Sequence, residues 1–392
     1  MTCPSRLGPE TEELALRALA AFPEAVAREP GVHDERVLAA VGRVPRHLLV
    51  PELLAPVGED RPARRWRLLR LDQQPAEHLA ICYGTDQVVV QLEGQPLGGW
   101  RGGDEYTGVP TAQSSGIGLI ALTLQELDPR SGDRVVEVGA CTGYLAALAA
   151  DLTGRQVTGV EIDRELVRVA VPRLAAAGAD VRMVARDGLR GLPDRTWNVI
   201  AASCGVRGLP AAWPAALAPG GRLLTTVTTG APGWGATALV RRDEHGLLSG
   251  QLTCGRWAHV PDRAAGWLPL QLDASVGPSR HRTAVLAPPA PTEYGFWVAL
   301  AHLAPGVRRH WCAPDVAEDA VVLVGTDGSR AVVDRDGSRV VERGPHDLWS
   351  VAEAVHSRWA AAGRPTVYGL EFDRSRVRVV GGPALSWELP LV

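Results

Sequence analysis

The chain has 392 residues, a formal net charge of −3, 46% hydrophobic residues and 22% charged residues. These values are typical of a globular protein of two domains, and no basic excess points to a nucleic-acid partner. The six scattered cysteines form no Cys-x-x-Cys pair, so we expect reduced thiols and no metal site. Because neither a secretory signal nor a membrane-spanning apolar run is visible, we expect a cytoplasmic protein without membrane contact.

The N-terminal third begins with two amphipathic helices. Apolar residues recur at helical spacing over residues 15–22 and again over residues 34–44. The stretch from residue 68 to residue 113 is irregular, with one strand-like run at residues 87–92. Within it, the glycine- and proline-rich segment 93–111 predicts a long loop of the kind that is usually functional or mobile.

Strands and helices alternate through the middle of the chain. An apolar helix over residues 117–127 precedes a strand at 134–138, which a Leu- and Ala-rich helix follows at 144–152. The alternation continues with a strand at 156–160, a helix at about 165–177, and strands at 181–184, 197–202 and 220–224. This order predicts an α/β fold, a Rossmann-like core whose mostly parallel sheet has helices on both faces.

The last part of the chain has a different pattern. Short strands at residues 321–324, 331–333 and 339–341 are joined by Asp-Gly turns, and an amphipathic helix over 348–359 follows. We therefore predict a first domain over residues 1–262, which includes the N-terminal helices, and a C-terminal α+β domain over residues 263–392.

The chemistry is concentrated where the first core strand ends. Gly139 follows Glu137-Val138 without a side chain, so that a ligand can approach the backbone, and the next strand ends at Glu161, which can accept hydrogen bonds from ribose hydroxyls. The glycines recur as Gly-x-x-x-Gly instead of the Gly-x-Gly-x-x-Gly of dinucleotide sites, and Glu137 would repel a phosphate. A cationic nucleoside without phosphate, S-adenosylmethionine, fits this pattern.

The predicted cofactor site joins the glycine turn to the acids that end the neighbouring strands. Asp187-Gly188 follows the third strand, where an acid can reach the adenine amino group. The same site would release S-adenosylhomocysteine as product. Its predicted residues are Glu137, Gly139, Cys141, Thr142, Gly143, Tyr144, Glu161, Ile162, Asp187 and Gly188.

These motifs stand in the order found in the protein L-isoaspartyl O-methyltransferases, which the chain resembles over about residues 33–262. The resemblance implies an S-adenosylmethionine-dependent enzyme that esterifies the side-chain carboxylate of an Asp or isoaspartate residue in a peptide. The similar segments are Pro45-Arg46-His47, Leu49-Val50-Pro51, Tyr83 with Asp86, Ser114-Ser115, Gly132 to Gly139, Thr142-Gly143-Tyr144, and Pro219 to Leu223.

The resemblance also implies the residues on the acceptor side. It places the active-site serine at Ser115, with Ser114 as a neighbour that could substitute and Asp86 shaping the acceptor side. Ser115 would orient the acceptor carboxylate, and it could also cap the helix that begins near Ile117. Because a carboxyl with a pKa of about 4 is ionised at neutral pH, the reaction needs no general base.

The chain departs from the family pattern in several places. Cys141 stands where the family usually carries a glycine, and Gly116-Ile117 follows the serine where the family usually has a residue and a proline. The segment before the serine is enlarged, and the chain continues well beyond the last core strand, whereas the family's repair enzymes stop there.

Three functions remain open at this point. Longer members resembling this chain occur beside genes for ribosomally made, modified peptides (RiPPs) such as lanthipeptides, which implies methylation of one Asp of one peptide, leading to an aspartimide or isoaspartate. General isoaspartate repair is the alternative that the core motifs favour. The third alternative is a non-catalytic adaptor that binds modified protein ends through its core and a partner through its C-terminal part.

Overall fold

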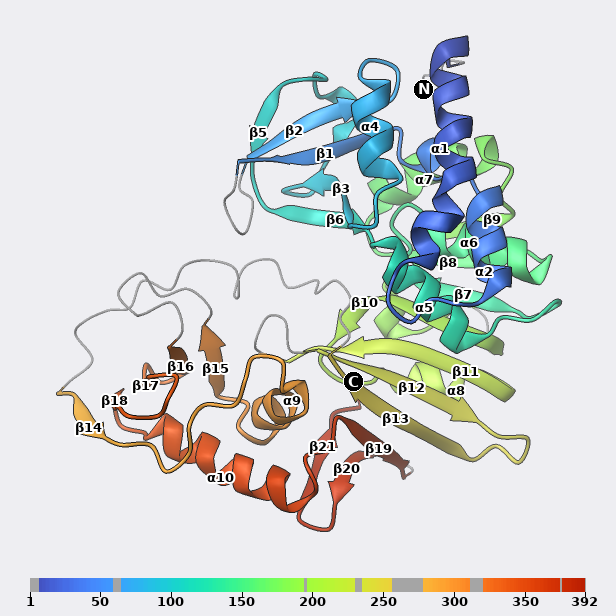
Figure 1. Cartoon of the computed structure of the whole chain (residues 1–392). Coiled ribbons are helices and arrows are strands. Elements are labelled where there is room, and N and C mark those ends of the chain that lie inside the picture. Colours follow the sequence, from blue (N-terminus) through green and yellow to red (C-terminus); the bar gives the residue numbers. More distant parts are fainter. Residues whose placement is uncertain are drawn as a thin grey trace.

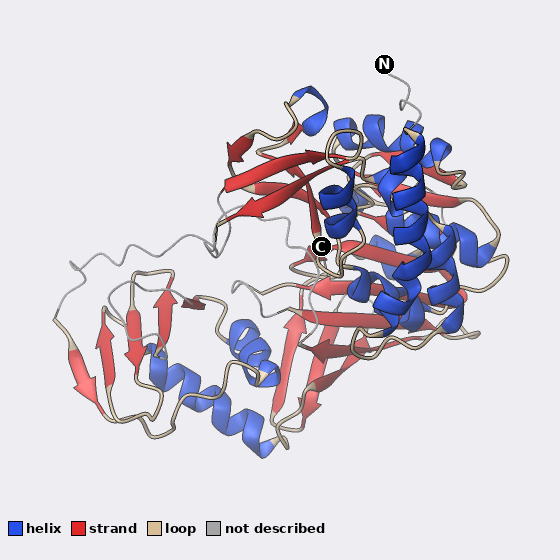
Figure 2. Cartoon of the chain, turned by 45° about the horizontal axis from the view of Figure 1, so that its top comes forward, coloured by secondary structure: helices blue, strands red, loops and turns tan. Residues whose placement is uncertain are grey.

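The computed structural model describes residues 7–58, 65–193, 196–229, 235–255, 278–310, 320–373 and 376–391. The strands in these residues form a six-stranded, a ten-stranded and a five-stranded sheet (Figure 1). In Figure 1 the six-stranded sheet lies above the ten-stranded sheet, and the five-stranded sheet lies to the left of it. Figure 2 shows the same three sheets from a second direction.

The two predicted N-terminal helices are confirmed. They are α1 (Pro9–Ala27) and α2 (Glu35–Arg43), and the side chain of Asp34 caps α2 by accepting a hydrogen bond from the Arg36 amide. A one-turn helix, α3 (Arg46–Leu49), follows directly, and its Arg46 side chain is fully buried.

The strand predicted at residues 87–92 is confirmed as β3 (Val88–Leu92), but the prediction of an otherwise irregular stretch ending in a long loop is wrong. Residues 93–111 instead contain short strands that belong to the six-stranded sheet, whose path is β4-β3-β1-β2-β5 with β6 paired to β3. Strands of two or three residues are too short to show the alternation that marks a strand in a sequence. The elements are β1 (Glu52–Val57), β2 (Arg65–Arg70), α4 (Pro75–Cys82), β3 (Val88–Leu92), β4 (Gln95–Pro96), η1 (Leu97–Gly99), β5 (Glu105–Thr107) and β6 (Pro110–Ser114).

The ten-stranded sheet contains the predicted α/β core. Its parallel part has the order β9-β8-β7-β10-β11, and antiparallel strands continue it as β12-β13-β19-β20-β21. Its core elements are α5 (Ile117–Leu127), β7 (Val135–Val138), α6 (Tyr144–Thr153), β8 (Val157–Glu161), α7 (Arg164–Ala176), β9 (Val181–Ala185), η2 (Gly188–Arg190), β10 (Trp197–Val206), α8 (Ala212–Ala215), β11 (Leu217–Val227), β12 (Ala236–Arg242) and β13 (Leu248–Cys254).

Helices cover both faces of the parallel strands, as the sequence pattern predicts. On one face, Val135, Val157 and Val199 share a buried cluster with residues of α5, α6 and α7. On the other face, Val136 and Ile200 share a cluster with tryptophans from α8 and from the C-terminal part. The carboxyl ends of β7, β8, β9 and β10 therefore meet at one edge of the sheet.

The C-terminal part is joined to this sheet. Strand β19 (Val367–Phe372) pairs with β13, and β20 (Val377–Gly382) and β21 (Leu385–Leu389) extend the sheet further. The division expected at residues 262 and 263 lies outside the described residues, and the strands on either side of it share one sheet. The remaining elements are β14 (Arg280–Arg282), α9 (Tyr294–Leu303), β15 (Val307–His310), β16 (Val321–Gly325), β17 (Arg330–Val333), β18 (Val340–Arg343) and α10 (Leu348–Ala361), which lies along the five-stranded sheet (Figure 2).

Substitution of Tyr368 tests whether the C-terminal strands unfold together with the core. Its fully buried side chain donates a hydrogen bond of 2.7 Å to the Gly295 carbonyl of α9. We expect Tyr368→Ala to lower the free energy of unfolding by about 3–5 kcal/mol, as for other large aromatic side chains removed from a core.

Urea unfolding followed by circular dichroism measures this loss. The control is Val367→Ala at the neighbouring, half-exposed position, which we expect to change stability by less than about 1 kcal/mol. A loss as small for Tyr368→Ala would contradict a shared cooperative core.

Candidate functional site

The connection between β7 and α6 has an unusual backbone. Gly139, Cys141 and Gly143 all have left-handed conformations, with φ values of 77°, 49° and 76°. The positive φ of Gly139 favours glycine, and a Cβ atom there would also crowd the Cβ of Cys204 at 3.1 Å. Cys141 adopts the same conformation with a side chain, which costs about 1–2 kcal/mol in an L-residue.

Glu161 joins this turn to the end of β8. Its buried carboxylate accepts hydrogen bonds from the Cys141 amide (2.9 Å) and from the Asp163 amide (3.0 Å). Each carboxylate oxygen retains a lone pair for a further donor. The next residue, Ile162, is 69% exposed and presents an apolar surface beside the acid.

Asp187 and Gly188 lie at the end of β9, next to the same edge. The Asp187 side chain caps η2 by accepting a hydrogen bond of 3.0 Å from the Leu189 amide. A Cβ atom on Gly188 would lie 2.5 Å from a methyl group of Val138, so this glycine packs directly against β7. The structure thus brings together the turn and the two strand ends that the sequence predicts as one site.

Glu137 lies beneath the turn and not in an open position. It is buried, accepts a hydrogen bond of 2.9 Å from the Ala146 amide of α6, and lies 2.5 Å from the Ser203 hydroxyl of β10. Burial raises the pKa of Glu137 from 4.5 to about 8. Its contacts connect β7 to the neighbouring strand and helix.

Glu137 should therefore make stability depend on pH. Between pH 4.5 and 8 the folded protein holds a proton that the unfolded chain has released, so the free energy of unfolding falls as the pH rises through this window. Glu137→Gln does not titrate, and we expect it to reduce this fall.

The measurement is urea unfolding of both proteins at several pH values from 5 to 8, with Glu165→Gln on the exposed face of α7 as control. Because other groups also titrate, the free energy of unfolding of each variant is compared with that of the wild-type protein at each pH. If the free energy of unfolding of Glu137→Gln fell with pH as steeply as that of the wild-type protein, the raised pKa of Glu137 would be contradicted.

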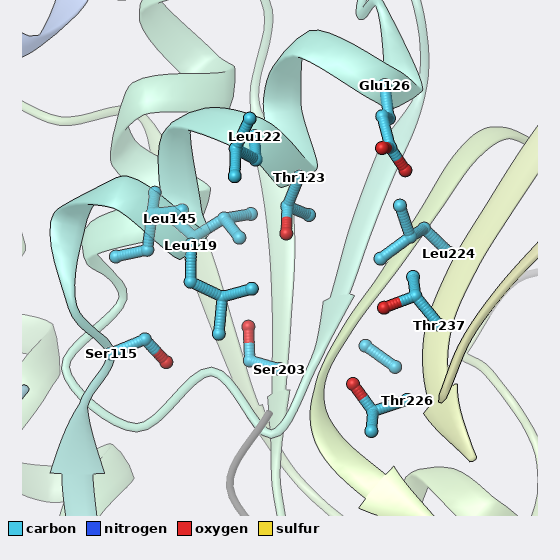
Figure 3. Close-up of a pocket in the computed structure, with 12 residues that line it drawn as sticks. Ser115, Leu119, Leu122, Thr123, Glu126, Leu145, Ser203, Leu224, Thr226 and Thr237 are labelled. Carbon is cyan, nitrogen blue, oxygen red and sulfur yellow. The ribbon is translucent and has the colours of Figure 1, made fainter. Parts of the chain in front are cut away.

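Ser115 lines a pocket between α5 and strands β10 to β12 (Figure 3). Ser115 and Ser203 lie at one end of this pocket and Glu126 at the other (Figure 3). The alternative role of Ser115 as a helix cap is wrong, because Gly116 is the N-cap residue of α5 and no side chain caps it. The lining residues are Ser115, Leu119, Ile120, Leu122, Thr123, Glu126, Leu145, Ala202, Ser203, Leu224, Thr226 and Thr237.

The other two predicted acceptor residues are placed differently. Ser114 is buried at the end of β6, where its hydroxyl accepts a hydrogen bond of 3.2 Å from Arg46. Asp86 is exposed between α4 and β3. The carbonyl of its neighbour Thr85 accepts a hydrogen bond from the Ile117 amide, so this loop contacts the start of α5.

Thr142, Gly143 and Tyr144 complete the turn. Cys141 and Thr142 line a second pocket, formed with residues of α7 and with the short helix η1 (Leu97–Gly99). Gly143 is the N-cap residue of α6, and Tyr144 is buried.

Two residues of the site were not predicted from the sequence. Ser203 directly follows the predicted strand at residues 197–202, and a polar residue at the carboxyl end of a core strand is a signal that could have identified it. Arg46 belongs to a segment already noted for its resemblance, but nothing in the sequence indicates that its guanidinium reaches Ser114 and Ser115.

In the part of the chain that the structure describes, no group of three or more His, Cys, Asp or Glu side chains is arranged to hold a metal ion. The same residues contain no helix long and apolar enough to cross a bilayer.

Comparison with known families gives a match over residues 106–254. These residues fit the family model described as "Protein-L-isoaspartate(D-aspartate) O-methyltransferase (PCMT)". The chain is 33% identical over 233 residues to a protein-L-isoaspartate O-methyltransferase of Methylorubrum extorquens (strain PA1), covering 59% of this chain and 82% of that protein. It is 32% identical over 196 residues to protein-L-isoaspartate O-methyltransferase 2 of Anaeromyxobacter sp. (strain Fw109-5), covering 50% of this chain and 63% of that protein.

A solved structure of a protein-L-isoaspartate O-methyltransferase also aligns with the chain. The alignment covers 97% of this chain and 100% of the other, with 18% sequence identity and a TM-score of 0.46.

Proposed function

The chain belongs to the protein-L-isoaspartate O-methyltransferase family of S-adenosylmethionine-dependent enzymes, and we propose that it methylates the side-chain carboxylate of an Asp or isoaspartate residue in a peptide. One observation carries this proposal. Ser115 lines a pocket together with Ser203, whose hydroxyl contacts Glu137 at the end of β7. These contacts support an acceptor held by Ser115 close to a cofactor held by the turn.

We infer that the cofactor occupies the edge formed by the ends of β7, β8 and β9. Glu161 would accept hydrogen bonds from the ribose hydroxyls through its remaining lone pairs, and the exposed face of Ile162 would pack against the adenine. The half-buried Asp187 carboxylate at the end of β9 is consistent with this placement. When bound, S-adenosylmethionine supplies an electrophilic methyl group.

The proposed reaction needs orientation more than proton transfer. The acceptor carboxylate is already ionised at neutral pH, so it can attack without a general base. The Ser115 hydroxyl would donate a hydrogen bond to one carboxylate oxygen and leave the other free to attack. Leu119 and Leu145 line the same pocket and would limit the water around the carboxylate, which strengthens electrostatic interactions there.

Glu161 provides a direct test of the cofactor site. We expect Glu161→Gln to weaken the binding of S-adenosylhomocysteine at least about tenfold, because charge-assisted hydrogen bonds to the ribose become neutral ones. Isothermal titration calorimetry measures the affinity, and Glu165→Gln, four residues along the chain in an exposed ion pair, is the matched control. Equal affinities for both variants would place the ribose elsewhere.

We further propose that the substrate is one modified ribosomal peptide, whose Asp residue is esterified and then closes to an aspartimide that opens to isoaspartate. The C-terminal part supports a role in choosing that peptide. Leu391 forms a bridge with Leu209, and the Leu209 amide donates a hydrogen bond of 2.9 Å to the Pro390 carbonyl. The end of the chain thus contacts the segment that follows β10, the strand that carries Ser203.

General isoaspartate repair is the second candidate, and the 82% coverage of a curated relative favours it. It differs from the first candidate in substrate range, because a repair enzyme accepts short unrelated isoaspartyl peptides. A non-catalytic adaptor would methylate neither kind of peptide.

Mass spectrometry of two incubations with S-adenosylmethionine separates these functions. One incubation contains a generic isoaspartyl peptide, and the other contains the modified peptide encoded beside the gene. We expect a gain of one methyl group, or a loss of water after ring closure, on the second peptide alone. Methylation of the generic peptide would indicate repair, and the absence of any reaction would contradict both catalytic functions.

A further inference from the structure

Arg46 is a fully buried cation whose contacts reach both sides of the proposed site. Its Nη2 atom donates hydrogen bonds to the Ser114 hydroxyl (3.2 Å) and to the Ser115 carbonyl (2.9 Å). On another side, its guanidinium lies over the ring of Tyr144, 5.3 Å from the ring centroid. One side chain of α3 therefore connects the segment that carries the acceptor serine to the first residue of α6.

The neighbours of these residues line both pockets. Ser115 and Leu145 line the acceptor pocket, and Leu145 directly follows Tyr144. Leu49, one turn after Arg46 in α3, lines the second pocket together with Cys141 and Thr142. The guanidinium lines neither pocket itself, but it contacts the serine segment and Tyr144, whose neighbours line them.

The positive charge of Arg46 has no counter-charge in the described part of the chain. No carboxylate among the described residues forms an ion pair with Arg46. The Nε and Nη1 atoms of Arg46 are buried without a hydrogen-bond partner, and so is the Tyr144 hydroxyl. Removing an ion from water costs several kcal/mol unless an opposite charge compensates it. A fold that keeps such a charge next to a ligand pocket favours an anion in that pocket.

We propose that Arg46 is a positioning residue of the acceptor site, which fixes Ser114 and Ser115 and makes the pocket prefer a carboxylate over a neutral acceptor. This inference rests on the proposed function. In the reaction, a carboxylate oxygen forms a bond to the methyl carbon while the carbon–sulfur bond breaks and its electron pair goes to sulfur. Arg46 gives and takes no proton in this step.

An arginine suits this role better than a lysine. Its planar guanidinium can donate two hydrogen bonds at one edge while a face lies on an aromatic ring, whereas an ammonium group is a compact point charge. We therefore expect Arg46→Lys to retain the charge preference but to lose part of the positioning.

The first measurement is the binding of peptides to the protein saturated with S-adenosylhomocysteine. The probe is the peptide that the wild-type protein methylates, compared with the same peptide carrying an amide in place of the acceptor carboxylate. We expect the wild-type protein to prefer the acid by about tenfold or more, and Arg46→Met to lose most of this preference. Arg43→Met, which removes an exposed arginine of α2 paired with Asp151, is the control and should retain it.

The second measurement is independent of any substrate. Hydrogen exchange of the backbone amides around residues 113–117 should speed up in Arg46→Met, less so in Arg46→Lys and not in Arg43→Met. Thermal unfolding is followed in parallel, and we expect Arg46→Met to be at least as stable as the wild-type protein because it removes an uncompensated buried charge. A purely structural arginine would instead lower the stability.

The outcomes separate this inference from the proposed function. If the wild-type protein methylates its peptide but Arg46→Met keeps the preference for the acid, or if the exchange around residues 113–117 is unchanged, the role of Arg46 is overturned and the function stands. If the wild-type protein methylates no peptide, the proposed function and the charge preference fall together, while the exchange result still decides whether Arg46 positions the serines.

Discussion

The backbone between β7 and α6 is the constraint on which the rest of the site depends. Three left-handed residues within five positions turn the chain sharply from strand to helix, and one of them, Cys141, does so with a side chain. Glu161 fixes this turn by accepting the hydrogen bond of the Cys141 amide, so the shape of the turn and the position of the acid at the end of β8 are coupled. The free amides at the start of the following helix follow from this geometry.

Buried ionisable side chains are arranged in a definite order around that turn. Glu137, below the turn, has a pKa raised by burial, and its hydrogen bonds connect β7 to α6 and β10. Glu161 keeps lone pairs at the edge of the sheet, where a nucleoside would lie. Arg46 contacts Ser114 and Ser115 on the acceptor side and forms no ion pair among the described residues. An anion beside Ser115 would thus meet a positive charge, while a ligand above the turn would meet the Glu161 carboxylate.

Much of this site could be predicted from the sequence because its elements are local and strongly patterned. The helix expected at residues 117–127 has these bounds in the structure, and the glycine turn, Glu161, and Asp187 with Gly188 are brought together because parallel strands end at one edge. The short strands within residues 93–111 were missed because two or three residues show no alternation.

Pairing between distant segments accounts for the other features that could not be predicted from the sequence. Strand β19 pairs with β13 across more than a hundred residues, and no feature of either segment specifies that partner. The hydrogen bonds of Arg46 likewise span 68 and 69 residues. Such contacts depend on how the six-stranded sheet and α3 pack against the core. Local patterns along the chain do not predict this packing.

The most direct test of the central claim is a crystal structure of the protein with S-adenosylhomocysteine bound. We expect the ribose hydroxyls within hydrogen-bond distance of Glu161, the adenine against Ile162, and the sulfur atom facing the pocket that Ser115 lines. A nucleoside bound instead between α7 and Leu97–Gly99, or a sulfur atom directed away from Ser115, would contradict the account.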